Sequence, residues 1–317
     1  MAGINVTSPY TTSDRYETAV ARYAEDMANN WLPQFELICK LSNEPGAAKR
    51  VYADYPVGQI GAHDTSTITE MTHGATAVQT ATPTAYSAKY KFSEIEQRRN
   101  PELLLEAADK LITGCKRTFE SLVFSQLPLG ISTTEVTTGH DGAAKKIFSD
   151  THGYGTGAGE QSNLGTSALS ATSLAAGRVA LRKWKTQSGE PAELDRGPLV
   201  LVVPPELGDT ARRLVGSPEY FQTTTNSADQ GWAATGAQIN PMADRPFTVC
   251  ESAYLSDADN WYLINQEHTP LNMWIPSAPS IVIAQDIANR DWIVSVLFEA
   301  SVYWRAPVSG CYGASVS

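Results

Sequence analysis

The segment from Asn100 to about residue 127 most constrains how this chain can fold, because its pattern is typical of one unusually long helix. Asn100 is a favourable N-cap, proline is tolerated in a first turn, and Glu102 suits the positive start of a helix. Apolar residues then recur at helical spacing: Leu104, Ala108, Leu111, Cys115, Phe119 and Leu122. At about 1.5 Å per residue this helix is about 40 Å long. We therefore expect a spine on which other layers rest, ended by Pro128 and Gly130.

Residues 49–92 predict a strand pair with little core of its own. Strand-forming residues mark its two ends (Val51, Tyr52, Tyr55 and Val57; Tyr86, Tyr90 and Phe92), and polar Thr- and Ala-rich alternation runs between them. A two-stranded hairpin is marginal when isolated, so this one must lie on something else. There is no Lys or Arg between Val51 and Ala88.

The remaining segments indicate a mixed α+β chain without internal repeats. A helical rhythm from Asp14 to about Cys39 has one apolar face, which we interpret as packed internally. The Gly-rich stretch 153–159 lacks the Gly-Lys-Ser/Thr end of a phosphate loop and predicts a plain loop. We expect helices from Ser170 or Ser173 to about Lys185 and from 204 to about 215, a polar loop over 217–246, and strands at 199–203, 247–250, 261–264, 281–284 and 292–304.

Charge is scarce on this chain. Charged residues make up 18% of the 317, and 24 Lys+Arg against 34 Asp+Glu leave a net charge of −10. Tight nucleic-acid binders neutralise phosphates with clustered cations, so that class is disfavoured. Two interpretations fit so few charges: a secreted polar domain, or a subunit largely covered by partners.

Targeting and redox signals are also absent from the sequence. No basic segment followed by an apolar stretch marks a signal peptide, and no apolar run approaches the ~20 residues of a membrane span. The four cysteines (Cys39, Cys115, Cys250 and Cys311) form no CxxC pair. We therefore expect free thiols in a reducing cytoplasm, with Cys115 a buried apolar residue on its helix.

The search for an active site yields no strong motif. The five histidines lie in or beside polar segments, where we expect them to be solvated. His140-Asp141 and Asp150-Thr151-His152 match no established metal-ligand spacing, and neither a GxSxG elbow nor a Cys in a nucleophile motif is present. Acid pairs such as Glu94/Glu96 fit solvated faces or turns. We expect no catalytic residue, cofactor site or metal site, and we expect that the protein is not an enzyme.

An ordered series of short motifs resembles the major capsid proteins of tailed bacteriophages, in particular the Mu-like head subunits of the Hong Kong 97-type capsid fold. The series covers about 90–317 and includes Phe148-Ser149-Asp150-Thr151-His152, Gln161-Ser162-Asn163-Leu164, Arg182-Lys183-Trp184-Lys185, Leu201-Val202-Val203-Pro204-Pro205-Glu206-Leu207, Asn260-Trp261-Tyr262-Leu263 and Cys311-Tyr312-Gly313. Each match alone is weak, whereas their order is specific.

The resemblance implies a domain organisation. Residues 1–48 would be an N-terminal arm, and 49–92 an extended loop lying across a neighbouring subunit. A peripheral domain would combine 93–164 and 285–317 around the spine helix 100–127, and an axial domain would span 165–284. Copies would form pentamers and hexamers that close into an icosahedral shell around double-stranded DNA.

The resemblance also implies partners and a location. The chain would associate with itself, with the portal and with packaged DNA held without tight specific binding; it would belong to the virion, assembled in the bacterial host cytoplasm, with no membrane partner. Because the arm starts almost at Met1, we expect a separately encoded scaffolding protein, although a processed chain is the alternative. Some relatives cross-link Lys to Asn from the extended loop. With no Lys between Val51 and Ala88 we expect none from the loop tip, so non-covalent contacts or a cement protein would strengthen the shell.

Three alternatives remain open at this point. An encapsulin-type nanocompartment shares the fold but encloses cargo proteins. A soluble metal-dependent enzyme would use His140, Asp141, Asp150 and His152. A secreted binding module would need ordered disulfides.

Overall fold

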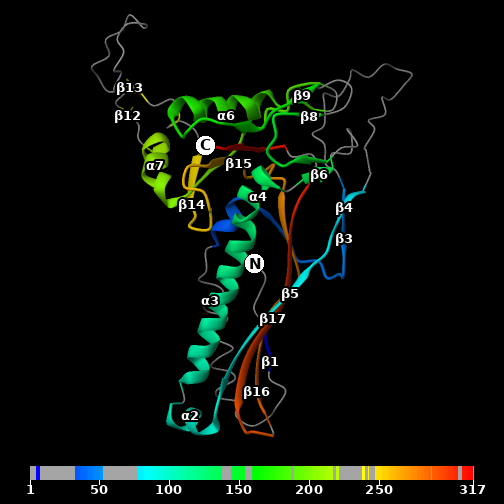
Figure 1. Ribbon diagram of the computed structural model, residues 1–317, viewed down its shortest axis with the longest axis vertical. Coiled ribbons are helices and arrows are strands. Elements are labelled where there is room, and N and C mark those ends of the chain that lie inside the picture. Colours follow the sequence, from blue (N-terminus) through cyan, green and yellow to red (C-terminus); the bar gives the residue numbers. More distant parts are fainter. Residues whose placement is uncertain are drawn as a thin grey trace, which may run out of the picture. The chain divides into compact units, whose positions relative to one another are not determined.

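The computed structural model (Figure 1) describes most of the chain outside its N-terminal segment and its longest loops. The described residues are 5–7, 33–52, 77–100, 102–133, 135–137, 144–153, 159–186, 189–216, 219–220, 238–239, 242, 247–286, 288–305 and 309–316. Most of the helical rhythm expected at 14–39 therefore lies outside them. Its end is not an α-helix, because a 3-10 turn η1 (Gln34–Leu37) follows Pro33 and a strand β2 (Lys40–Ser42) comes next.

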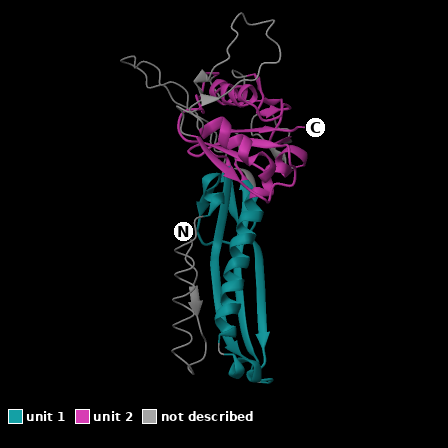
Figure 2. Cartoon of the chain, turned by 90° about the vertical axis from the view of Figure 1, so that its left-hand side faces the viewer, with its two compact units in different colours: residues 1–51, 79–123, 271–303 teal, residues 52–78, 124–270, 304–317 magenta. Residues whose placement is uncertain are grey.

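The chain forms two compact units, each built from segments distant in the sequence (Figure 2). Unit 1 comprises residues 1–51, 79–123 and 271–303. Unit 2 comprises residues 52–78, 124–270 and 304–317.

The predicted long helix is the main helix of unit 1, named α3 (Leu103–Phe124). The side chain of Asn100 accepts a hydrogen bond from the backbone N–H of Glu102 at 3.2 Å, so its predicted capping role is confirmed. The expected apolar face is buried at Leu104, Ala108, Leu111, Cys115 and Phe119. A short helix, α2 (Glu94–Arg99), precedes it.

The prediction that Pro128 and Gly130 stop this helix was wrong. α3 ends at Phe124, and a second helix, α4 (Gln126–Ser132), contains both residues. Pro128 lies in the first turn of α4, where a backbone N–H has no helical partner to lose. Gly130 is needed for packing, because a Cβ there would come within 3.0 Å of Ile147 Cβ.

A five-stranded sheet completes unit 1. The path of the sheet is β1-β16-β17-β5, and β2 also pairs with β16. The strands are β1 (Asn5–Thr7), β16 (Leu271–Gln285), β17 (Trp292–Trp304) and β5 (Thr84–Phe92). β1 and β2 run parallel to β16 and β5 runs antiparallel to β17. β16 begins ten residues before the predicted strand at 281–284. The prediction missed its first half because Pro276 and Pro279 are atypical of a strand.

Aromatic contacts hold α3 to this sheet. Phe298 of β17 lies with its ring centroid 5.0 Å from that of Phe119 on α3 and 5.2 Å from that of Tyr86 on β5. Phe35 of η1 lies 6.3 Å from Phe119. A smaller cluster joins Val51, Ala81, Trp274 and Tyr303. Here β3 (Lys49–Tyr52) pairs with β4 (Ala77–Ala81). The predicted pairing of the two ends of 49–92 was therefore wrong, because Tyr86–Phe92 belongs to β5 and pairs with β17 of unit 1. Residues 53–76 lie outside the described ranges.

Unit 2 is built on a sheet that is covered on both faces. Its order is β10-β18-β15-β11-β14, with bounds β10 (Leu164–Gly165), β18 (Cys311–Ala314), β15 (Trp261–Asn265), β11 (Leu199–Val203) and β14 (Phe247–Glu251). The predicted strands at 199–203, 247–250 and 261–264 are confirmed. All residues of β11 and β15 are buried, as a near-continuous apolar run predicts.

Two helices pack against one face of that sheet. α6 (Ala171–Lys183) starts at Ser170, whose side chain accepts a hydrogen bond from the backbone N–H of Ser173, as predicted. η2 (Pro205–Leu207) leads into α7 (Gly208–Gly216), which confirms the helix expected after Pro204. The remaining strands are short pairs: β6 (Glu135–Thr137) with β7 (Ala144–Lys146), β8 (His152–Gly153) with β9 (Glu160–Gln161), and β12 (Glu219–Tyr220) with β13 (Gln238–Ile239).

None of the helices that the structure describes is both long and apolar enough to cross a membrane.

Candidate functional site: the charged tip and open edge of unit 1

Of the four residues considered for a metal-dependent enzyme, the structure describes two, Asp150 and His152. His140 and Asp141 are not described, and Asp150 is exposed. His152 was expected to be solvated, and that was wrong: only 1% of it is exposed. Its Nε2 lies 3.2 Å from the carbonyl oxygen of Ile147 and 3.1 Å from Oδ1 of Asn163.

Asn163 explains why His152 is buried. Its Oδ1 accepts the backbone N–H of Ser149 at 2.9 Å, and its Nδ2 donates to the carbonyl of Ile147 at 2.9 Å. These bonds fix the orientation of the amide, so Nε2 of His152 must be the donor to Oδ1. The imidazole ring also lies 5.9 Å from the ring of Trp184. This cluster organises the loop after β7 and offers no reacting group to a substrate.

The cysteines have no reactive character. All four are free and buried, which confirms the predicted free thiols and the buried position of Cys115. Burial raises the pKa of Cys115 to about 11 and that of Cys311 to about 12, so neither is a thiolate at neutral pH. Within the described ranges, no three His, Cys, Asp or Glu side chains gather closely enough to hold a metal ion.

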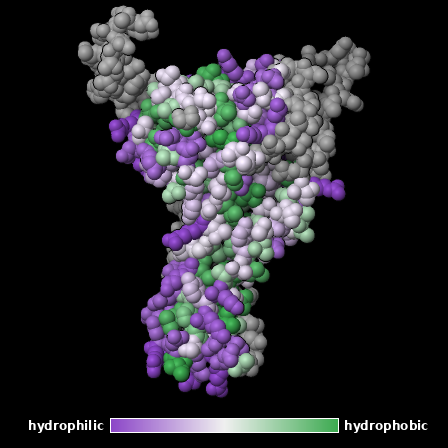
Figure 3. Space-filling view, in the orientation of Figure 1, coloured by the Kyte–Doolittle hydropathy of each residue, from purple (hydrophilic) through white to green (hydrophobic). Residues whose placement is uncertain are grey.

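Hydrophilic residues gather at the end of unit 1 formed by α2 and the β16–β17 turn (Figure 3), and ion pairs lie there. We call α2 together with residues 285–291 the tip. Asp286 shapes its turn: Oδ1 accepts the backbone N–H of Ala288 at 3.0 Å, and its own N–H donates to the carbonyl of Asp291 at 2.8 Å. Arg290 adopts a left-handed conformation with φ of 55°, a rare state for a residue with a side chain.

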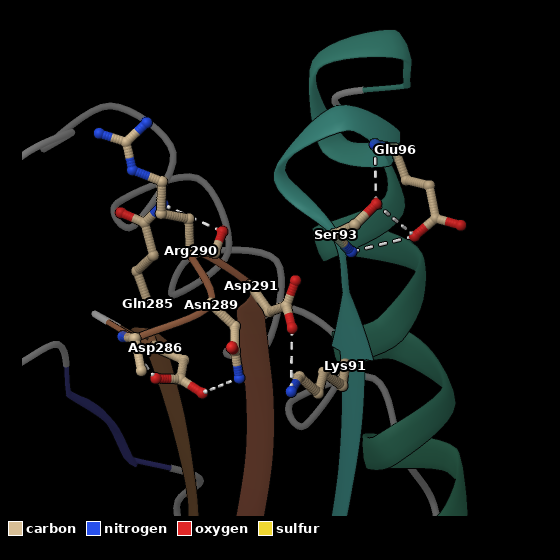
Figure 4. A network of polar contacts seen from close by, with 9 residues as sticks. Lys91, Ser93, Glu96, Gln285, Asp286, Asn289, Arg290 and Asp291 are labelled. Carbon is tan, nitrogen blue, oxygen red and sulfur yellow. Dashed lines mark hydrogen bonds and ion pairs between the residues drawn. The ribbon is translucent and has the colours of Figure 1, made fainter.

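Two ion pairs connect the turn to the neighbouring elements, and Figure 4 shows the one between Lys91 and Asp291. Nζ of Lys91, at the end of β5, lies 2.9 Å from Oδ2 of Asp291. The hydrogen bond with Asp291 raises the pKa of Lys91, and the charge of Asp291 acts in the same direction. On the other side, Arg290 Nη1 lies 3.7 Å from Oε2 of Glu94 on α2. Glu94 Oε1 also accepts a hydrogen bond from Arg98 at 2.5 Å.

α2 itself is fixed by a capping box. Ser93 Oγ accepts the backbone N–H of Glu96 at 3.3 Å, and Glu96 Oε2 accepts the backbone N–H of Ser93 at 3.0 Å. These hydrogen bonds, led by the one from the Ser93 backbone, lower the pKa of Glu96. The solvated-face interpretation of Glu94 and Glu96 missed this helix, although the Ser-x-x-Glu spacing was visible in the sequence.

The tip and the adjoining strand also expose large apolar side chains. Ile95 of α2 is 63% exposed, Leu297 of β17 55% and Tyr90 of β5 40%. Ion pairs beside exposed apolar groups are suited to contact with another protein, since interfaces combine apolar contact with a polar rim. Charged and apolar side chains are thus exposed together at this end of unit 1.

A known protein family matches most of this chain. A family model described as phage capsid protein matches residues 76–306, well over half of the chain. No curated protein matches the sequence.

Solved structures add the fold. The capsid of a native GTA particle aligns with a TM-score of 0.54 at 14% identity over 90% of this chain and 91% of that chain. A capsid subunit of bacteriophage PhiM1 gives 0.52 at 11% identity over 90% and 88%, and a structure from Mycobacterium phage Patience gives 0.51 at 13% identity over 100% and 94%. At such identities the likeness shows the fold alone, which is that of Hong Kong 97-type capsid proteins, as the motif series predicted.

Proposed function

Since the chain belongs to the phage capsid protein family and has the Hong Kong 97-like fold, we propose that its copies associate as pentamers and hexamers that close into an icosahedral shell around double-stranded DNA. The observation that carries this proposal is the open construction of unit 1. Its sheet ends in an exposed strand, and its surface presents Leu297, Tyr90 and Ile95 to solvent. Contacts between copies would cover these groups.

We extend the proposal to the domains. Residues 1–48 act as the N-terminal arm and 49–92 as the extended loop, which reaches a neighbouring subunit ahead of its last strand, β5, while β5 itself pairs with β17 of the same copy. The peripheral domain comprises 93–164 and 285–317, and the axial domain 165–284. The pairing of β3 with β4 supports the loop assignment, because it gives the segment between them a fixed base from which to reach another copy.

The net charge of the chain supports a shell that does not bind its packaged DNA tightly. A net charge of −10 disfavours counterion release from DNA phosphates, so the packaged genome stays free to enter and leave. The partners of the shell in this proposal are a scaffolding protein, the portal and a cement protein. The assembled protein is part of the virion, formed in the cytoplasm of the bacterial host.

Electron microscopy of the expressed full chain, alone and with a scaffolding protein supplied, tests the proposal. We expect closed icosahedral particles with five-fold and six-fold clusters. A chain that stays monomeric under both conditions would overturn the shell proposal. Particles purified from infected or induced cells should contain DNA protected from nuclease; protein cargo in its place would favour an encapsulin-type compartment.

A further inference from the structure

The two edges of the unit 1 sheet differ in whether further strands pair with them. At one edge, β16 is paired by β2 at residues 272–274 and by β1 at 280–282. Pro276 and Pro279 lie in the gap between these pairings, and proline has no N–H to offer to another strand. β5 forms the other edge. It pairs with β17 over nine consecutive positions, Thr84 to Phe92, and no strand of the described ranges pairs with its outer side.

β5 is open on both faces as well as along its edge. Tyr86 lies opposite Phe298, so Tyr86, Ala88 and Tyr90 share the sheet face that packs against α3. Ala88 and Tyr90 are nevertheless exposed, which shows that α3 does not reach over this strand. The other face carries Lys89 and Lys91. An exposed edge of this length is a template for another strand unless it is paired.

The sequence of β5 is self-complementary. If two copies pair antiparallel around Ala88, Tyr86 of each lies opposite Tyr90 of the other, Ser87 lies opposite Lys89, and Ala85 lies opposite Lys91. Aromatic pairs are favourable across strands, and no two charges face each other in this register. Moving the centre to Lys89 would place that lysine opposite its own copy. The register centred on Ala88 also uses all nine residues, from Thr84 to Phe92.

We propose that β5 pairs with β5 of a second copy around a twofold axis through Ala88, which joins two unit 1 sheets into one. This inference rests on the proposed function and names one of its contacts. A twofold axis that relates antiparallel strands stands perpendicular to the sheet, so α3 of both copies lies on the same side. That arrangement suits a shell, whose subunits all present one face inward, and closed shells contain twofold contacts.

Cysteine cross-linking tests the register directly. Ala88→Cys places two thiols opposite each other, with Cα atoms about 4.5–5.5 Å apart, within reach of a disulfide. Ala85→Cys is the matched control, because the same change on the same exposed strand places the two thiols about 20 Å apart at about 3.3 Å per residue. The native cysteines are buried and add little background. In oxidised, assembled particles we expect most A88C subunits to run as dimers on a non-reducing gel and A85C subunits to run as monomers.

A charge pair provides an independent readout. Ala88→Glu puts two carboxylates opposite each other, whereas Ala85→Glu puts a carboxylate opposite Lys91. We expect A88E to lower the yield of assembled particles by about tenfold or more, since each shell repeats the contact many times, and A85E to retain the yield of the unsubstituted chain.

The outcomes separate this inference from the proposed function. Normal particles in which the A88C subunits do not cross-link overturn the strand pairing but leave the shell intact. An introduced thiol that is shielded from alkylation in A88C particles, while the subunits still run as monomers, also overturns it, because another segment, such as the Lys- and Arg-free loop of a neighbour, then covers the edge. Failure of the unsubstituted chain to form particles overturns the proposed function instead.

Discussion

The two sheets of this protein show two ways of stabilising strands. In unit 2, β11 and β15 are buried along their whole length, between α6 and α7 on one face and Phe148 and Trp304 on the other. In unit 1, α3 packs on β17 through Phe119 and Phe298, and β5 is left exposed. Unit 2 therefore contains its own core, whereas unit 1 has surface left for a partner. Substitutions that separate stability from assembly can test this contrast.

The largest effect is expected in the core of unit 2. Trp261 is fully buried, its ring lies 5.5 Å from that of Tyr312, and its Nε1 donates to the carbonyl of Ser167 at 3.1 Å. Trp261→Ala should lower the free energy of unfolding by about 4 kcal/mol, measured by denaturant titration of the unassembled chain. Ile95→Ala, at an exposed apolar position, is the control and should change stability by less than about 0.5 kcal/mol. Equal effects of the two substitutions would contradict the contrast.

Two neighbouring residues of β17 test unit 1 itself. Phe298 is buried against Phe119, whereas Leu297, on the opposite sheet face, is 55% exposed. Phe298→Ala should cost about 3 kcal/mol in the unassembled chain. Leu297→Ala should cost less than about 0.5 kcal/mol there but reduce the yield of particles. If L297A particles form as well as those of the unsubstituted chain, this face of the sheet is not part of a subunit contact.

The sequence pattern predicted those elements whose buried residues follow a regular spacing or a continuous apolar run. The periodicity of α3 and the continuous apolar run of β11 each describe a buried surface directly. The full length of β16 could not be predicted from the sequence. Its two prolines are tolerated because, within the described ranges, no strand pairs at their positions with the edge of β16 that faces away from β17, and this is visible only in the sheet. α4 was missed for a similar reason, since Pro128 is acceptable only in a first turn that the pattern did not reveal.

The candidate site was harder to find, because a surface of the kind proposed for assembly has no sequence motif. The chemistry of Lys91, Asp291 and Arg290 depends on a hairpin that brings distant residues together. His152 shows the reverse error: polar neighbours in sequence suggested solvent, but Asn163, eleven residues away, provides a buried acceptor. The ordered motif series identified the family, while the tip and the β5 edge required the fold.

A smaller effect is expected at the tip, where the capping box links stability to pH. Ser93→Ala removes the hydroxyl that accepts the Glu96 N–H and should destabilise α2 by about 1 kcal/mol. The pKa of Glu96 is lowered in the folded chain, so its stabilisation is present above the usual carboxyl pKa of about 4.3 and is lost as the pH falls through the folded value. Hydrogen exchange of α2 amides between pH 7 and pH 3 should show this loss in the unsubstituted chain.

The matched control for the tip is Ser132→Ala. Ser132 also forms a side-chain hydrogen bond at the end of a helix, to the carbonyl of Pro128 at 3.1 Å, but has no carboxylate partner there. It should leave the pH dependence of α2 unchanged, whereas S93A should weaken it, because the substitution removes the hydroxyl that bonds Glu96 Oε2 but keeps the backbone N–H of residue 93. An unaltered pH profile in S93A would contradict a contribution of the Ser93 hydroxyl to the lowered pKa of Glu96.

The smallest expected effect has the opposite sign and tests the solvent side of α3. Gly114 lies in the middle of this helix, and a Cβ there would meet no atom within 4 Å, so nothing in the chain requires glycine. Gly114→Ala should therefore stabilise the unassembled chain by about 0.5–1 kcal/mol, seen as a higher thermal midpoint, because alanine loses less conformational freedom in a helix. A lower midpoint would contradict the open position of Gly114. If particle yield falls while the free chain becomes more stable, a neighbouring copy approaches α3 at this glycine. If particle yield is unchanged and the free chain is more stable, this side of the helix stays uncovered in the shell. The surface of unit 1 used for assembly is then confined to β5, the outer sheet face and the tip.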